Sequence, residues 1–561
     1  MITRRDVLQI GAAVAAYGFG SLERVAAQQR ITQDELLAFE HYGNVTLLHM
    51  ADLHAQLMPI YLREPSVNIG AGDSRGRPPH LTGKAFLEHY GIAPRTAAAY
   101  ALAPDDFVAL ARTYGRLGGL DRIATVVKAV RAERGSDRVL FLDGGDSWQG
   151  SLTANRTKAQ DMVDCLKLIG PDAMTGHWEF TYGEARLKEL IERLGTPFLA
   201  LNVRDTEWQE PVFDGYKLFD KGSVRVAVLG EAFAYTPVAN PRWMVPKWTF
   251  GIREDDVRAT VAKARKEGAQ LVVLLSHNGF DCDRKMAARV DGINVILTAH
   301  THDALPLVTT VGKTLLVASG SDGKFMSRLD LDVRGMEVTG YRYKLIPMFA
   351  DAIAPDPEMA LKIAQVRAPF ASELARVVGH SESLLYRRGT FNGTIDDLIC
   401  SAILTERDAE IALSPGFRWG STLLPGTSIT VEDISNATAM TYPQVYRTTM
   451  TGARLKEILE DVADNLFNPD PYYQQGGDMV RCGGLGYRID VTQSIGQRIS
   501  QLTLLPSGEL LDADKEYVVA GWASVNENVE GPPVWDLLER YIARLQNVRV
   551  EPNNSIKVVG I

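Results

Sequence analysis

The sequence predicts a layered α/β protein with a second, smaller α/β domain, and three observations support this fold class. Short apolar runs bounded by Gly and Asp are typical of buried strands in a parallel sheet, and 45–50, 139–142 and 271–275 are such runs. Apolar residues at helical spacing lie between them, for example over 120–133. Because the two patterns alternate, we expect helices packed on the faces of a sheet.

The first domain is expected to contain the following elements. The strand at 45–50 is followed by a long, proline-containing stretch, 57–116, which we interpret as an irregular loop that roofs or flanks the functional site. We then predict, in chain order, a helix over 120–133, a strand over 139–142, helices over 162–169 and 185–194, strands over 197–202 and 224–229, a helix over 255–266, and strands over 271–275, 295–297, 328–333 and 341–345.

The second domain is expected to follow a helical linker. We predict the first domain over 28–350, the linker over 351–379 and the smaller domain over 380–561. Within the smaller domain we expect a helix over 394–405 and strands over 410–413, 427–431, 487–491, 498–505 and 517–521.

The N-terminus has the pattern of an export signal. Arg4 and Arg5 precede a short apolar stretch, 10–22, and Ala27 ends a small-residue segment of the A-x-A type. The arginine pair favours the twin-arginine route, so we predict a signal peptide over 1–27 and a periplasmic location. The alternative is an ordinary N-terminal helix with a chance arginine pair. The stretch is too short for a membrane span.

Bulk composition excludes several classes of protein. The chain has 561 residues, of which 45% are hydrophobic and 23% charged, so a large core and two to four domains are expected. The net charge is −9 and no basic block is present, which argues against a nucleic-acid partner. Four scattered cysteines are too few for a disulfide framework or a CxxC zinc site.

Metal-ligand residues gather where the predicted strands end. Because sites in open α/β sheets form at the carboxyl ends of strands, we expect these clusters to converge at one edge. The D-x-H and H-x-H spacing of two would put both side chains of a pair on one face if the strand continued. The seven candidates are Asp52, His54, Asp146, His177, His277, His300 and His302.

Seven candidate ligands are too many for one tetrahedral zinc, and they suit two ions bridged by one carboxylate. Mixed imidazole and carboxylate ligands admit Mn, Fe, Co or Zn. Such a pair lowers the pKa of a bound water, so we expect hydrolysis of phosphate or an analogous oxyanion ester. The sequence contains no GxxxxGK[ST] loop, which argues against a nucleotide-driven motor.

The order of these motifs, D-x-H, GGD, GHWE, SH and HTH, resembles the calcineurin-like metallophosphoesterases and among them the 5′-nucleotidase family. The resemblance implies a four-layer sandwich as catalytic domain and a C-terminal substrate domain. It implies that a first metal is bound by Asp52, His54 and His302, that a second is bound by His177, His277 and His300, and that Asp146 bridges them.

The segment 176–181 departs from the family pattern. His177 takes the place of a metal-binding Asn, Trp178 that of a catalytic His, and Thr181 that of the Asp that orients it. General acid catalysis typically contributes about 10²–10⁴-fold. A chain that keeps the metals but lacks the acid suits a leaving group that needs no proton. Gly476 and Gly477 also stand where nucleotidases carry an aromatic base clamp.

With twin-arginine export, this pattern resembles the SoxB thiosulfohydrolases. That resemblance implies a di-manganese enzyme whose substrate is a cysteine S-thiosulfonate on the C-terminal arm of the SoxYZ carrier. Metal-bound hydroxide would attack the sulfonate sulfur, the S–S bond would break, and sulfate and a persulfide on the carrier would result. We expect catalysis to depend on Asp146 and His177.

Three further residues are candidates for substrate binding. Trp178 would shape a channel wall, unless it is simply core; Arg418 would hold an anion, unless it forms a structural salt bridge; Tyr442 would lie in the interdomain cleft. Two alternative functions remain at this stage: a periplasmic 5′-nucleotidase or other phosphoesterase, and a non-enzymatic metal-binding scaffold.

Overall fold

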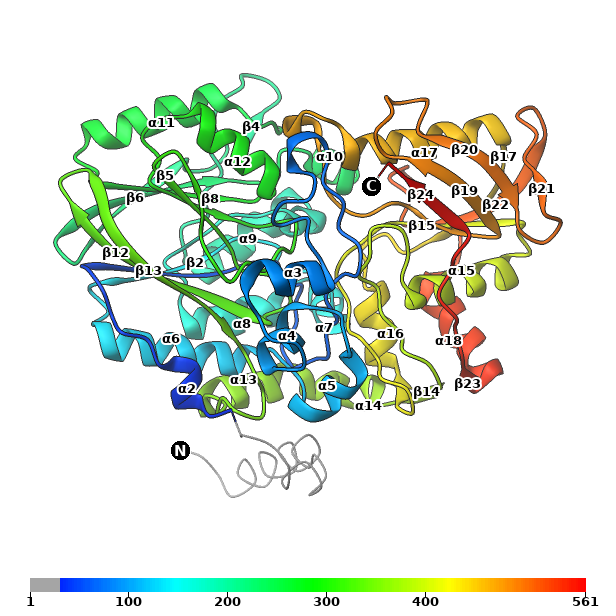
Figure 1. The fold of residues 1–561 in the computed structure, drawn as a ribbon, viewed down its shortest axis with the longest axis horizontal. Coiled ribbons are helices and arrows are strands. Elements are labelled where there is room, and N and C mark those ends of the chain that lie inside the picture. The colour runs from blue at the N-terminus through cyan, green and yellow to red at the C-terminus, as the bar shows by residue number, and fades with distance from the viewer. Residues whose placement is uncertain (1–30, 561) are drawn as a thin grey trace.

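The computed structural model describes residues 31–560. The predicted signal peptide over 1–27 lies outside the described residues. Two units lie side by side in Figure 1. The N-terminal unit runs from α2 (Gln33–Leu37) to β13 (Glu337–Pro347), and the C-terminal unit runs from β14 (Val377–Ser381) to β24 (Ile556–Val559). No helix in the described part of the chain is long and apolar enough to cross a bilayer.

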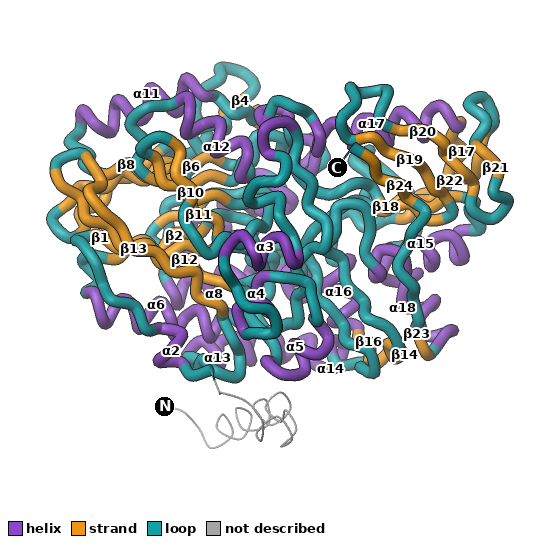
Figure 2. The backbone as a smooth tube through the Cα atoms, viewed as in Figure 1, coloured by secondary structure: helices purple, strands orange, loops and turns teal. Residues whose placement is uncertain are grey.

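Two sheets form the centre of the N-terminal unit, and Figure 2 shows their strands in one colour. The first contains, in spatial order, β13, β12 (Phe325–Arg334), β1 (Val45–Met50), β2 (Val139–Asp143) and β3 (Ala173–Met174). The second contains β10 (Thr309–Val311), β11 (Thr314–Ala318), β9 (Val295–Thr298), β8 (Leu271–Ser276), β6 (Val224–Glu231) and β5 (Tyr216–Lys221). Strands β1, β2 and β3 are parallel, as are β6, β8, β9 and β11.

The period of two along each strand divides the core into layers. Leu47 and Val273 lie in the apolar core between the two sheets. Leu48 faces the opposite side, where α6 (Leu120–Arg134), α8 (Gln160–Ile169) and α13 (Pro357–Arg367) cover the first sheet. Val272 packs under α11 (Glu254–Lys266) and α12 (Phe280–Arg289) on the outer face of the second sheet. The unit is therefore the expected four-layer sandwich.

Most predicted elements of this unit are present, and two predictions are wrong. Residues 197–202 form no strand: only Phe198 and Leu199 make single β-bridges. The stretch 57–116 is not irregular throughout, because it contains the helices α3 (Gly83–Tyr90), α4 (Ala97–Leu102) and α5 (Phe107–Tyr114). Its prolines lie outside these helices, where they interrupt no helical hydrogen bond. Further helices are α7 (Leu152–Thr157), α9 (Glu184–Leu194) and α10 (Thr236–Ala239).

The segment 57–116 does flank the junction of the two units (Figure 1). The backbone N–H of Arg63 donates to Thr422 Oγ1 at 3.1 Å, and that of Thr390 donates to the Val67 carbonyl. Towards the sheet edge, His80 Nε2 lies 2.7 Å from Asp281. The segment is thus fixed to both units.

The C-terminal unit combines three small sheets with helices. It is joined to the sandwich by α13, a 3₁₀ turn and α14 (Ala371–Leu374). Its helices are α15 (Thr394–Arg407), α16 (Val431–Thr438), α17 (Gly452–Phe467) and α18 (Val534–Leu545). Its main sheet contains β17 (Val445–Thr451), β22 (Glu516–Trp522), β15 (Ile411–Ser414) and β18 (Arg481–Gly483). The others contain β21 (Glu509–Leu510), β20 (Ile499–Leu504), β19 (Leu485–Asp490) and β24, and β16 (Ser428–Thr430), β14 and β23 (Asn547–Val548).

Candidate metal centre

The candidate ligands lie in loops just beyond the strands. Strand β1 ends at Met50 and β9 ends at Thr298, so the spacing argument that assumed continuing strands is wrong. Asp52 and His54 instead have φ values of 52° and 47°. Asp146, His300 and His302 share this left-handed conformation. Non-glycine residues rarely adopt it, and such strain is concentrated at functional sites.

The first group of ligands contains Asp52, His54 and His302, all buried. The Nε2 atoms of the two histidines lie 3.0 Å apart. His302 Nε2 also lies 3.5 Å from Asp52 Oδ1. The three donors therefore point at a common space.

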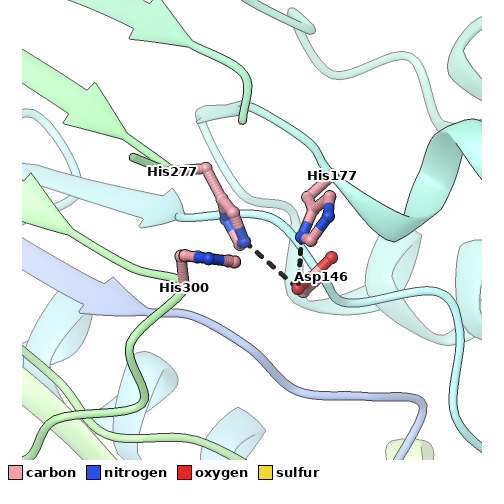
Figure 3. A group of neighbouring side chains, drawn as sticks. All are labelled: Asp146, His177, His277 and His300. Atoms are coloured by element: carbon pink, nitrogen blue, oxygen red, sulfur yellow. Dashed lines mark hydrogen bonds and ion pairs between the residues drawn. The ribbon is translucent and has the colours of Figure 1, made fainter. Parts of the chain in front are cut away.

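The second group contains Asp146, His177, His277 and His300 (Figure 3). Asp146 Oδ2 lies 3.2 Å from His177 Nδ1 and 3.1 Å from His277 Nε2. The four side chains come from loops after three different strands and from the start of the 3₁₀ turn Trp178–Tyr182. The fold has brought all seven candidates together.

Two carboxylates lie between the groups. Asp146 Oδ2 also lies 3.9 Å from His54 Nε2 of the first group. Asp52 Oδ1 lies 3.6 Å from His277 Nε2 of the second group. Both carboxylates therefore face both groups, as a bridging carboxylate must, and Asp146 is the one for which the family resemblance implied this role.

The donor set fits two cations. Asp52 and Asp146 are at most 1% exposed, and neither has a Lys or Arg ion-pair partner among the described residues. Buried carboxylates are ordinarily paired or bound to metal. Five imidazoles and two carboxylates are a ligand set for divalent transition metals. The two groups fit a dinuclear metal centre.

The pKa shifts of the candidate ligands go in both directions. Burial raises the pKa of Asp52 well above its usual value. Burial disfavours the charged form of His277, but Asp146 outweighs it and raises the pKa to about 10.

The shifts of His302 and Asp146 instead favour metal binding. Burial lowers the pKa of His302 well below its usual value, and His54 and Arg388 lower it further. Burial opposes ionisation of Asp146, but His177 and His277 hold its pKa well below its usual value. Neutral imidazole and ionised carboxylate are the forms that bind cations.

Hydrogen bonds to the second ring nitrogen orient two of the histidines. His277 Nδ1 lies 2.6 Å from the Gly144 carbonyl oxygen, and His300 Nε2 lies 3.0 Å from that of Gln475. A carbonyl only accepts, so each of these nitrogens carries a proton, and the other nitrogen of the ring is the one that can bind a cation.

Glu179 connects the loops that carry Asp146 and His177, two of the residues of the second group. Its buried carboxylate accepts hydrogen bonds from the backbone N–H groups of Asp146, Ser147, Trp148 and His177 at 2.7–3.3 Å. One side chain thus fixes the backbone on both sides of the Asp146–His177 contact.

A cavity of about 430 Å³ opens beside the two groups and is lined by both units. Trp178 forms part of its wall and makes edge-to-face contacts with Phe417 and Trp419, at centroid distances of 5.5 and 5.2 Å. Phe417 and Trp419 stack on each other at 4.2 Å. Trp419 also stacks on His54 at 5.3 Å. The metal groups therefore face an aromatic wall.

Two comparisons with known proteins identify relatives of this chain. Residues 377–536 match the family described as 5′-nucleotidase, C-terminal domain. The structure of the Thermus thermophilus sulfate thiohydrolase SoxB superposes with a TM-score of 0.90 at 35% sequence identity, covering 93% of this chain and 98% of that one. The chain belongs to the 5′-nucleotidase family.

Other members of the 5′-nucleotidase family are more distant. The 5′-nucleotidase of Bos taurus is 24% identical over 462 residues, which are 72% of this chain and 76% of that protein. A 5′-nucleotidase precursor from Thermus thermophilus has a TM-score of 0.72 at 20% identity, covering 92% of this chain and all of that one, and shows the shared fold.

The three residues singled out for substrate binding lie in different settings within this family fold. Trp178 lines the cavity and is also packed among aromatic rings, so its position agrees both with a channel wall and with core packing. Arg418 also lines the cavity, but its guanidinium donates to the carbonyls of Thr301 and Gly477 and pairs with Asp478. These contacts agree with the alternative interpretation of Arg418, a structural salt bridge.

Tyr442 lies at the junction between the units and not in the cavity wall. It is buried, and its hydroxyl donates to the Ala239 carbonyl at 2.5 Å. It therefore connects the two units. Ala239, which accepts this hydrogen bond, and Trp178 line the cavity, whereas Tyr442 does not.

Sequence reasoning missed several residues of the site. Phe233 stacks on His300 at 4.1 Å and contacts His177 at 4.3 Å. Trp419 and Gln475 belong to the C-terminal unit. Trp419 contacts His54 of the first group, and Gln475 contacts His300 of the second group. The Phe-Arg-Trp segment at 417–419 was a usable signal, but Phe233 and Gln475 lie in no recognisable motif.

Proposed function

We propose that this protein is a dinuclear metal hydrolase that releases sulfate from a cysteine S-thiosulfonate on the SoxYZ carrier. The observation that carries the proposal is the position of Trp178. Trp178 lines the cavity and its backbone N–H donates to Asp146, at the position where nucleotidases of the family carry a catalytic histidine. Five of the seven candidate ligands line the cavity, and every histidine of its lining is one of them, so the lining offers no further imidazole for protonating a leaving group.

The chemistry of the leaving group agrees with this arrangement. A sugar alkoxide leaves poorly without a proton, whereas a persulfide carries negative charge well. Hydrolysis adds water to the sulfonate sulfur and breaks the S–S bond, giving sulfate and a persulfide on the carrier. Two bound cations would supply an activated water and neutralise sulfonate charge.

The aromatic wall disfavours a nucleotide. Phe417 and Trp419 are stacked on each other at 4.2 Å. One stacked pair of rings has a centroid distance of roughly 4.5 Å. A base held between Phe417 and Trp419 would require these two rings to lie about twice that distance apart. The same wall suits a slender peptide arm, because it is apolar and continuous with Trp178.

The proposal also assigns the metal ligands, the metal, the export route and the domain boundaries. Asp52, His54 and His302 would hold one cation, and His177, His277 and His300 the other, with Asp146 between them. Manganese is the proposed metal. Twin-arginine export over 1–27, a periplasmic location and the boundaries 28–350, 351–379 and 380–561 stay part of the proposal.

A direct comparison of substrates tests the function. The purified, Mn²⁺-loaded protein is mixed in single turnover with thiosulfonate-loaded SoxYZ or with AMP, and sulfate or phosphate is measured. We expect sulfate release to be far faster. Phosphate release from AMP at a comparable rate would favour the phosphoesterase alternative.

The variant His177→Ala is the control for this comparison. It removes one candidate ligand and should abolish both activities. If metal is bound and neither product appears with the wild-type protein, the scaffold alternative is favoured.

A further inference from the structure

The ligand loop 300–302 is held by the C-terminal unit at each of its three residues. Nε2 of its first residue, His300, lies 3.0 Å from the Gln475 carbonyl oxygen. The carbonyl of its second residue accepts a hydrogen bond from Arg418 Nη1 at 3.0 Å. The carbonyl of its third residue accepts one from Arg388 Nη1 at 3.3 Å. Two candidate metal ligands thus depend on contacts that cross between the units.

The Gln475 contact determines which nitrogen of His300 is available. Because the carbonyl accepts the Nε2 proton, Nδ1 keeps its lone pair for a cation. Phe233 stacks on the His300 ring at 4.1 Å and limits its rotation. Without the carbonyl, the imidazole could adopt either tautomer.

The approach of the C-terminal unit to His300 requires a glycine. Gly476 has a φ of 69°, and a Cβ atom there would lie 2.3 Å from His300 Nε2. Its neighbour Gly477 has a similar φ of 76°, but a Cβ atom there would meet nothing closer than the Gly416 carbonyl oxygen at 3.6 Å. Of these two neighbours, Gly476 alone combines the left-handed backbone with contact to a candidate ligand.

The two arginines are themselves fixed. Arg388 is 5% exposed and lies 3.6 Å from Glu64, whose carboxylate also accepts a hydrogen bond from Lys324 at 2.7 Å. Arg418 also pairs with Asp478. The Arg388–Glu64 pair crosses between the units and would be lost together with the contacts to loop 300–302 if the C-terminal unit moved away. The Arg418–Asp478 pair lies within the C-terminal unit and would be kept.

We propose that Gln475, Arg418 and Arg388 are positioning residues of the metal centre, so that cation binding and closure of the C-terminal unit over loop 300–302 are coupled. The coupling is reciprocal: a closed unit raises cation affinity, and bound cations stabilise the closed arrangement. This goes beyond the proposed function, because it holds whatever substrate the site takes.

The two adjacent glycines provide a matched test. The full-length variants Gly476→Ala and Gly477→Ala both place a Cβ on a left-handed backbone, but only the first pushes on His300. Mn²⁺ affinity and stoichiometry are measured by competition with a chelator. We expect Gly476→Ala to weaken Mn²⁺ binding by about 10- to 100-fold, as loss of an orienting contact does. Gly477→Ala should stay within about threefold of wild type.

Equal losses in both variants would show that backbone strain alone acts, and unchanged binding in both would also overturn the proposal. Thermal unfolding of the metal-free variants is recorded, and Arg388→Lys, which keeps the charge, replaces any variant that does not fold. Arg388→Gln should weaken Mn²⁺ binding, whereas Arg454→Gln, which removes only an exposed ion pair to Glu457, should not.

The reciprocal effect is measured by hydrogen exchange. Addition of Mn²⁺ to the wild-type protein should slow exchange in the segment 475–478, and exchange unchanged by Mn²⁺ would contradict the coupling. The result is independent of the proposed function. A protein that binds two Mn²⁺ ions cooperatively with closure but releases no sulfate would refute the function and leave this inference standing.

Discussion

The backbone N–H of Trp178 donates to Oδ1 of Asp146 at 2.6 Å, while Oδ2 of the same carboxylate faces the histidines of both metal groups. Trp178, which stands where the family has a catalytic histidine, therefore still orients the carboxylate of Asp146. Because the donor is a backbone group, this contact does not depend on the side chain at 178. The role of the indole can consequently be tested separately from the integrity of the metal groups.

The variant Trp178→His returns an imidazole to this position. We expect no increase in the rate of sulfate release, because a persulfide leaves without a proton. Single-turnover sulfate release from the loaded carrier is the measurement, and Trp178→Phe is the control for loss of the indole. An increase of about tenfold or more, within the range of general acid catalysis, would contradict the leaving-group argument.

The variant Asp146→Asn tests whether this carboxylate joins the two groups. It removes a negative charge that faces His54, His177 and His277. We expect Mn²⁺ binding to weaken by at least about a hundredfold and activity to be lost with it. Elemental analysis after desalting is the measurement. The exposed His89→Ala variant should retain two metals, and full metal occupancy in Asp146→Asn would argue against a bridging role.

The sequence predicted which candidate ligands lie together better than it predicted the geometry of the loops that carry them. His277 and Asp146 were found because each follows an apolar run, and parallel strands bring such ends to one edge. Asp52 and His54 do lie in one group, but the argument from a continuing strand that placed them together was wrong. The strand stops at Met50, and a left-handed turn, which no local pattern indicated, aims both side chains.

The residues that surround the ligands were largely beyond prediction. Trp419 and Gln475 are distant in sequence from the histidines that they contact, His54 and His300. Their positions follow from how the two units pack, and a single sequence contains no periodic signal for such packing. The four-layer fold was more accessible, because alternating strands and helices leave few arrangements.

Glu179 provides a prediction for stability. Its carboxylate accepts four backbone N–H groups, two at each oxygen, and is fully buried. In Glu179→Gln, the side-chain NH₂ would face two of these donors in either orientation. We expect a destabilisation of about 2–3 kcal/mol, measured as a lower Tm and denaturation midpoint. The exposed Glu192→Gln variant should unfold like wild type, and a similar result for Glu179→Gln would contradict this account.

Metal removal should lower thermal stability. Without cations, Asp52 and Asp146 are buried carboxylates that no Lys or Arg of the described chain compensates. Mn²⁺ at about a hundred times its Kd would stabilise the fold by about 2.7 kcal/mol per site, so chelation should lower the Tm and titration with Mn²⁺ should restore it. Mg²⁺ prefers oxygen ligands and should restore it poorly at a site with five imidazoles. A Tm that does not respond to Mn²⁺, or that responds equally to Mg²⁺, would mean that these side chains do not form a transition-metal centre.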